Sequence, residues 1–143
     1  MLHLKQQLQQ QRQQLATLLA NHRLAIKQSQ QAEKQHSGIL IEQQDRFHKK
    51  LTARPTKTSD LMRQIKASQK QQKRLKQLQI ITKKREKSYQ QTKIALINTT
   101  ELLEDCSKVS ALEPHTCPLT LQIAMEKQLR INAAKIALGF SSI

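Results

Sequence analysis

The chain has 143 residues, a formal net charge of +15 and an aromatic content of only 2%. Aromatic side chains supply much of the buried area in ordinary cores, so this composition argues against a thick globular core. Gln, Lys, Leu and Ala favour helices and are abundant here, so we expect an all-α protein in which long helices share narrow apolar seams.

The positive charge is concentrated in the first two thirds of the sequence. Residues 1–58 carry ten Lys and Arg against three Asp and Glu, and residues 59–100 carry eleven against two. Residues 101–143 carry four against five. Such a field attracts acidic protein surfaces, nucleic acid or anionic lipid without selecting among them. No apolar run is long enough to span a membrane and no export signal is evident, so we expect a cytoplasmic protein.

Residues 2–52 are predicted to form one long helix, because they contain no Pro and a single Gly. Apolar residues recur there at alternating steps of three and four, which is typical of a coiled coil. His22 and His36 continue one register of this pattern, where they could set pairing register, tune assembly near neutral pH, or simply lie at a loose exposed seam. The predicted seam of this helix comprises Leu8, Leu15 and Leu18.

Residues 53–60 are predicted to form the turn of a hairpin. Pro55 disfavours helix at the residue before it, and polar residues at 58–60 can cap the next helix. The second helix is predicted from about Asp60 to about Lys108, and a short loop requires the two helices to lie antiparallel. Its predicted seam has one residue per heptad: Leu61, Ser68, Leu75, Thr82, Tyr89, Leu96 and Leu103.

A second break is predicted at residues 109–118, which include two Pro. Pro118 suits the first turn of a third helix, and Gly139 is a natural C-terminal stop. We therefore expect two parts, a basic helical hairpin of residues 1–108 and a linker with an amphipathic helix in residues 109–143. The apolar face of this third helix either folds back onto the hairpin or docks on a partner, and it comprises Leu121, Met125, Leu129 and Ile136.

Six basic residues of the second helix fall within about a third of its circumference, opposite the apolar seam. We call them the basic stripe: Arg63, Lys66, Lys70, Lys73, Arg74 and Lys84. Acidic residues are almost absent around them, so the stripe is a candidate surface for phosphates or for an acidic protein. A solvated coiled-coil face would also carry charges. The stripe has no interleaved aromatics for base stacking and no recognisable groove-reading module.

The sequence offers no catalytic, cofactor or metal-binding motif. Gly38 and Gly139 are isolated, so no glycine-rich phosphate loop is present, and no Ser nucleophile motif occurs. Cys106, His115 and Cys117 match no usual zinc spacing, and we interpret them as two free thiols and a loop histidine. We therefore predict that the chain is not an enzyme and takes no cofactor or metal.

The layout around the hairpin resembles a known family. The first helix begins almost at Met1, and the second opens with Ser59-Asp60-Leu61-Met62-Arg63-Gln64-Ile65 before Gln- and Lys-rich heptads. In length, charge and topology, residues 1–108 look like the FliJ/YscO-like coiled-coil stalk proteins of type III secretion and flagellar export. The resemblance implies a two-helix hairpin that inserts into the export ATPase ring and engages the export gate and chaperones. Residues 119–138 depart from that pattern, so no functional residue is carried over.

The sequence thus predicts a basic helical-hairpin protein that serves as a stalk or adaptor in a bacterial type III secretion-like assembly. Its expected partner is a protein with an acidic surface. The alternative is a nucleic-acid-binding accessory factor, for instance in plasmid mobilisation or replication. A membrane-surface role is the weakest of the three, because polar residues interrupt the seams and Trp is absent. The oligomeric state stays open.

Overall fold

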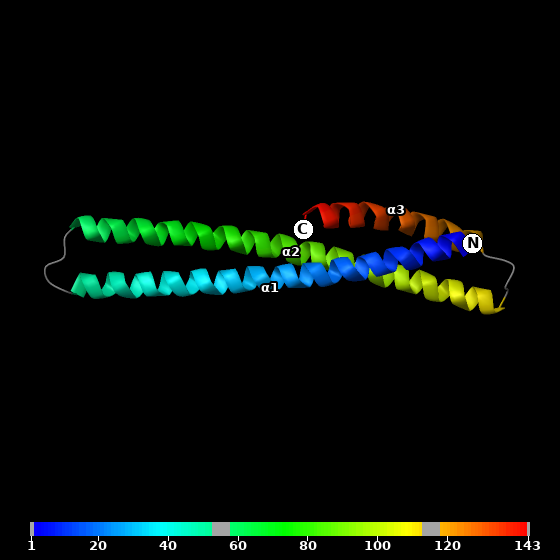
Figure 1. Ribbon diagram of the computed structural model, residues 1–143, viewed down its shortest axis with the longest axis horizontal. Coiled ribbons are helices and arrows are strands. Elements are labelled where there is room, and N and C mark those ends of the chain that lie inside the picture. Colours follow the sequence, from blue (N-terminus) through cyan, green and yellow to red (C-terminus); the bar gives the residue numbers. More distant parts are fainter. Residues whose placement is uncertain (1, 53–57, 113–117, 143) are drawn as a thin grey trace. The chain divides into compact units, whose positions relative to one another are not determined.

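The computed structural model describes residues 2–52, 58–112 and 118–142 (Figure 1). These residues form three helices: α1 (Leu2–Thr52), α2 (Thr58–Leu112) and α3 (Leu119–Ser142). No strand occurs among them, and α1 and α2 pack against each other in antiparallel directions. The predicted all-α fold, a two-helix hairpin with a shorter C-terminal helix, is confirmed. Across the described helices, none has a stretch both long and apolar enough to cross a bilayer.

The ends of α2 and α3 differ from those expected. α2 continues past Lys108 to Leu112, since nothing in residues 109–112 breaks a helix. α3 also continues through Gly139 to Ser142, so the predicted stop at that glycine is wrong. The breaks predicted at residues 53–60 and 109–118 fall partly on residues 53–57 and 113–117, which lie outside the described part of the chain.

The start of α3 is set by Pro118. Its carbonyl oxygen accepts hydrogen bonds from the backbone N–H groups of Leu121 and Gln122, at 3.0 and 3.1 Å. A residue just before a helix normally accepts the first intrahelical bond in this way. The proline therefore lies immediately before the helix rather than within its first turn.

The three helices divide into two compact units. We call residues 1–25 with 86–143 the three-helix unit, and residues 26–85 the two-helix unit. α3 lies wholly in the first, where it packs on parts of α1 and α2; this settles the choice between folding back and docking elsewhere. Every buried apolar side chain in the described residues belongs to the three-helix unit: Leu8, Leu15, Leu18, Ala95, Leu103, Cys106 and Met125.

The core of the three-helix unit repeats every seven residues. Two pairs join α1 to α3 across 121 residues of sequence: Gln11–Asn132 and Leu18–Gly139. One heptad earlier, Leu4 of α1 packs on the apolar cluster that contains Met125 of α3. On α2, Cys106 belongs to the cluster of Met125, Thr99 accepts a hydrogen bond from Asn132, and Thr92 lines the same hollow as Gly139. Heptad spacing in all three helices thus places one side chain from each helix in every layer.

The middle layer is polar and its polar groups are paired. Asn132 is 0% exposed, and its Nδ2 donates to Thr99 Oγ1 at 2.8 Å and to Gln11 Oε1 at 3.1 Å. Its Oδ1 accepts a bond from Gln128 Nε2 at 2.8 Å, while Gln11 Nε2 donates to the carbonyl of Leu129 at 3.0 Å. A buried polar network is costly when only partly paired, so these bonds fix the register of the three helices.

The seam of the two-helix unit is polar and mostly half-buried. Ser29 and Thr82 are its buried residues within the described ranges, and Ser29 accepts a hydrogen bond from the Arg85 guanidinium. His36 Nδ1 lies 2.9 Å from Gln71 Oε1. Because an amide oxygen only accepts, His36 Nδ1 must carry the proton in this contact. This unit is held by polar contacts rather than by an apolar core.

Gln43 and Gln64 extend this polar seam one heptad from His36 and Gln71. The side-chain oxygens of both glutamines are shielded from solvent and lack a hydrogen-bond partner among the described residues. An acceptor buried in this way costs about 1–3 kcal/mol. This layer therefore weakens the pairing of the two helices.

Candidate interaction surface

All six residues of the basic stripe lie in the two-helix unit, and all are exposed. None of them forms a hydrogen bond or ion pair with another described residue. Their side chains are therefore not used to hold this part of the fold together. They are available to an external partner.

The two-helix unit carries most of the positive charge of the protein. Residues 26–85 hold sixteen Lys and Arg against four Asp and Glu, which is a formal net charge of +12, whereas the rest of the chain carries +3. Residues 61–85 contain no Asp or Glu. The unit without buried apolar side chains among its described residues thus has the stronger positive electrostatic potential. This potential opposes compaction of the unit and attracts anions.

Part of the stripe lines a hollow on α2, which we call the lysine hollow. Its volume is about 390 Å³, and it is lined by Lys66, Gln69, Lys70, Gln72, Lys73 and Lys76. Clustered ammonium groups repel one another, and a bound carboxylate or phosphate relieves that repulsion. Lys76 is not part of the basic stripe, because it lies outside that third of the helix circumference. Its long flexible stem nevertheless reaches the same surface.

A second hollow lies between α1 and α2, and we call it the apolar hollow. Its volume is about 530 Å³, and it is lined by Gln44, Phe47, His48, Ile65, Ser68, Gln69 and Gln72. Phe47 and Ile65 are its apolar side chains, and the other five lining residues are polar. Ile65 is 38% exposed and Phe47 is half-buried. Gln69 and Gln72 line both hollows, so the apolar hollow and the lysine hollow adjoin.

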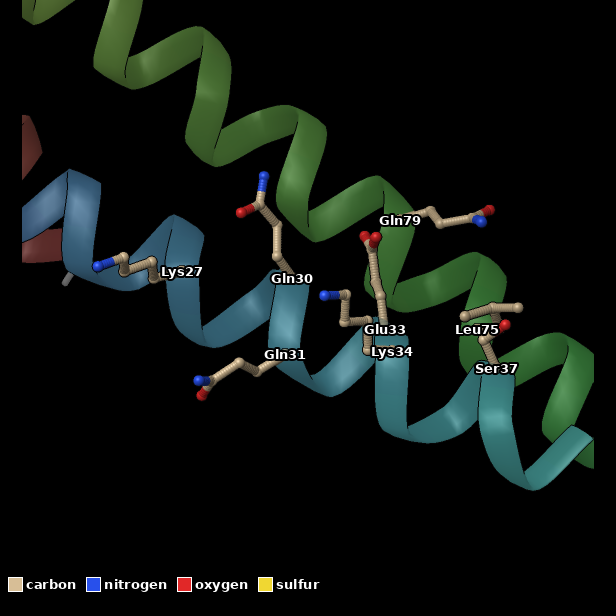
Figure 2. A pocket seen from close by; sticks show the side chains of 8 residues that line it. All are labelled: Lys27, Gln30, Gln31, Glu33, Lys34, Ser37, Leu75 and Gln79. Atoms are coloured by element: carbon tan, nitrogen blue, oxygen red, sulfur yellow. The ribbon is translucent and has the colours of Figure 1, made fainter.

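Figure 2 shows a third hollow of about 490 Å³ between the same two helices. It is lined by Lys27, Gln30, Gln31, Glu33, Lys34, Ser37, Leu75 and Gln79. Leu75 is its one apolar side chain, and Glu33 offsets one of its two lysines. This hollow is therefore less basic than the lysine hollow.

The leucines of the predicted hairpin seam that are buried all lie in the three-helix unit. Leu8, Leu15, Leu18 and Leu103 are buried, whereas Leu61, Leu75, Tyr89 and Leu96 are half-buried. Tyr89 accepts a hydrogen bond from Arg23 Nη2 at 3.2 Å, and the guanidinium lies 6.0 Å from the ring centroid. This bond raises the pKa of Arg23 and lowers the pKa of Tyr89. The seam thus includes a polar contact at the edge of the three-helix unit.

The predicted face of α3 is only part of its contact surface. Met125 is fully buried, and Leu121, Leu129 and Ile136 are half-buried. Asn132 and Gln128 are also buried. Neither belongs to the predicted face of α3, because that face was defined by its apolar residues. The seven-residue spacing of Met125, Asn132 and Gly139 points to Asn132, and Gln128 lies one helical turn before it.

No known protein-family model matches the chain, and no curated protein or solved structure is significantly similar to it. Its function must therefore be argued from its own surfaces.

His22 and the cysteine group complete the candidate sites. His22 is 4% exposed, and its burial lowers its pKa below the usual value of 6.5. It lines a hollow of about 180 Å³ in the three-helix unit, together with Lys135 of α3. Cys106 is a buried free thiol, while His115 and Cys117 lie outside the described residues. Among the residues that are described, no group of three His, Cys, Asp or Glu side chains could hold a metal.

Proposed function

We propose that the chain is a non-enzymatic interaction protein of the cytoplasm, whose two-helix unit docks on an acidic surface of a partner protein. The observation that carries this proposal is the concentration of charge. A net charge of +12 lies on a unit with no buried apolar side chain among its described residues, and four lysines line one hollow of it. Such a unit gains stability from an anionic partner, because binding offsets its internal repulsion.

The resemblance to FliJ/YscO-like stalk proteins supports a bacterial type III secretion-like assembly as the setting. It makes the export ATPase, the export gate and the secretion chaperones the first partners to test. The resemblance depends on the α1–α2 hairpin. In this proposal the chain acts as a stalk or adaptor, and the three-helix unit provides its folded core.

An acidic protein surface fits the two-helix unit better than a nucleic acid does. Phe47 is the single aromatic residue in residues 26–85, and it is half-buried between the helices. Single-stranded nucleic acid gains much of its affinity by stacking bases on exposed aromatic side chains, which this unit does not offer. An apolar hollow beside the lysines also favours a partner with apolar side chains. Nucleic-acid binding by an accessory factor is the alternative that the following experiment separates.

Charge reversal on the stripe tests the proposal. The test variant carries Lys66→Glu, Lys70→Glu, Lys73→Glu and Arg74→Glu. The control variant carries the same number of reversals at exposed lysines of the same unit: Lys27→Glu, Lys34→Glu, Lys49→Glu and Lys83→Glu. Each is compared with the wild type in pull-downs with purified candidate partners after nuclease treatment, and in DNA and RNA filter binding at two salt concentrations.

We expect the test variant to lose the protein complex and the control variant to keep most of it. Nucleic-acid affinity of the wild type should be weak at physiological salt. Tight nucleic-acid binding that falls steeply with salt would instead favour the accessory-factor function, because neutralised phosphates release counterions. If neither set of reversals changes either assay, the stripe is a solvated face and the proposed function is wrong.

A further inference from the structure

We infer that the partner presents an acidic amphipathic helix, which lies in the apolar hollow of the two-helix unit. Its apolar side chains contact Phe47 and Ile65, and its carboxylates lie against the lysines of the adjoining lysine hollow. This inference rests on the proposed function and adds the form of the segment that binds. The geometry behind it is the adjacency of the two hollows, which share Gln69 and Gln72.

The chemistry of the two hollows matches the two faces of such a helix. An amphipathic helix presents apolar side chains at steps of three and four and polar side chains on its other face. Lys66, Lys70 and Lys73 are exposed and pair with no described residue, so they are available to carboxylates along one edge of the helix. Ile65 and Phe47 remain partly exposed and can bury further area against its apolar face.

The walls of the apolar hollow favour a helical segment over an extended one. Both walls are interior turns of α1 and α2, whose backbone N–H and C=O groups are already bonded within each helix. An extended segment would find no backbone partners there, whereas a helix satisfies its own backbone. α3 already packs on other turns of α1 and α2, so these helices accept a third helix elsewhere.

Neither α3 nor a second copy of the chain fits this hollow as well. Residues 119–142 carry three Lys and Arg against one Glu, so α3 is itself basic. α3 is also engaged in its own unit through Met125 and Asn132. Two copies of the two-helix unit would each bring a net charge of +12 to the contact, and like charges oppose association.

The inference is tested on the whole 143-residue chain with a synthetic helical peptide as the probe. The peptide has about four turns, Leu at steps of three and four, and Glu at the remaining positions. A second peptide has the same composition in a scrambled order that cannot form an apolar face. Binding of each labelled peptide is followed by fluorescence anisotropy, beside a DNA duplex of equal charge.

Two pairs of variants locate the site. The first test variant, Phe47→Ser with Ile65→Ser, removes the apolar lining of the hollow. Its control is Ile41→Ser with Ile80→Ser. These two isoleucines belong to the same unit, are 56% and 54% exposed, and line none of the three hollows. Lys66, Lys70, Lys73 and Lys76 are changed to Gln in one variant. Lys27, Lys34, Lys49 and Lys83 are changed to Gln in its control, which removes the same charge.

A further measurement does not depend on substitutions in the hollow. A spin label on the apolar face of the bound peptide should broaden the methyl signals of Ile65. Those of Ile41 and Ile80 should broaden much less, because they lie outside the apolar hollow.

We expect the amphipathic peptide to bind and the scrambled one to bind at least about tenfold more weakly. The hollow variant and the lysine variant should lose this preference, and both controls should keep it. If both peptides bind equally, and the two lysine variants lose equal affinity, the partner would still be acidic. It would not place a helix in the apolar hollow, and the inference would be wrong. If the amphipathic peptide does not bind saturably, the inference is also wrong. If the DNA duplex binds tightly while the peptide does not, the proposed function is wrong as well.

Discussion

Gly139 lies directly against Leu18, so close that a Cβ atom on the glycine would be 2.4 Å from Leu18 Cδ2 and 2.9 Å from Cδ1. Leu18 is fully buried and cannot turn away freely. Gly139 is inside α3 rather than at its end, so its missing side chain serves close packing of two helices and not a turn. Gly38 is also inside a helix. A Cβ atom added there would have no atom within 4 Å apart from those of its own stretch of helix.

The two glycines should therefore respond to alanine in opposite ways. Gly139→Ala overpacks the core and should destabilise the protein by about 1–3 kcal/mol. Gly38→Ala should stabilise it by about 0.5–1 kcal/mol, because alanine favours the helix without a clash. Urea unfolding followed by circular dichroism measures both. Shifts of the same sign would show that the contact with Leu18 is not tight, and Leu18→Ala should recover part of the loss in Gly139→Ala.

The two ends of the hairpin seam should differ in their sensitivity to truncation. Leu15→Ala removes a fully buried side chain and should cost about 2–5 kcal/mol. Leu75→Ala removes a half-buried side chain that lines the hollow of Figure 2, and should cost about 1 kcal/mol or less. Thermal melting of both variants gives the comparison. Equal costs would mean that the apolar core extends into the two-helix unit.

Asn132→Leu should destabilise the three-helix unit although it makes the core more apolar. The change leaves the polar atoms of Gln11, Thr99 and Gln128 without their shared partner, at about 1–3 kcal/mol for each buried group left unpaired. Thr99→Val breaks one edge of the network and should cost less. Amide hydrogen exchange in α3 reports the loss, and exchange no faster than in the wild type would mean that the network does not hold α3 in place.

Lowering the pH should weaken the three-helix unit through His22. Its folded-state pKa is lowered by burial, so the folded state favours the neutral ring. The corresponding stability is present above the unfolded pKa of about 6.5 and is lost as the pH falls below it toward the folded value. Lys135 is the charged group in the same hollow, and Ser88, Gln91 and Thr92 of α2 are uncharged. Melting temperatures between pH 7.5 and 5 should fall less in His22→Gln than in the wild type or in His36→Gln.

The unpaired glutamines of the two-helix unit offer a stabilising change. Gln43→Leu with Gln64→Leu removes two shielded acceptors that lack partners and adds apolar seam in the same heptad. We expect the melting temperature to rise, since replacing an unsatisfied polar group by an apolar one of similar size removes its desolvation cost. A lower melting temperature would show that both oxygens are hydrated in solution.

Much of the fold follows from local sequence signals. Helix-forming residues and the scarcity of Gly and Pro predicted the three helices, and Pro55 and Pro118 marked the breaks between them. What the sequence did not reveal is which heptad series would meet a third helix. Thr92, Thr99 and Cys106 form a second heptad series on α2. These residues are small or polar, so they lack the apolar pattern by which the leucines mark a seam.

The interaction surface was only partly predictable. The six residues of the basic stripe follow from helical periodicity, and the structure places all of them in solvent. The apolar hollow joins Phe47 of α1 with Ile65 of α2, and their proximity depends on the register of the hairpin, which heptad patterns alone do not fix. Long side chains such as Lys76 also reach surfaces that a helical projection assigns to another face.

The hydrogen bond between Gln11 and Asn132 has a consequence for synthesis. The chain is made from its N-terminus, so residues 119–142 leave the ribosome well after α1 and α2. Until then the first turns of α1 lack the helix that completes their layers, so their leucines stay incompletely covered although α1 and α2 are already made. Closing a contact over 121 residues also costs more entropy than closing a local one. The nascent chain should therefore expose Leu8 and Leu15 to chaperones or other apolar surfaces until α3 has left the ribosome.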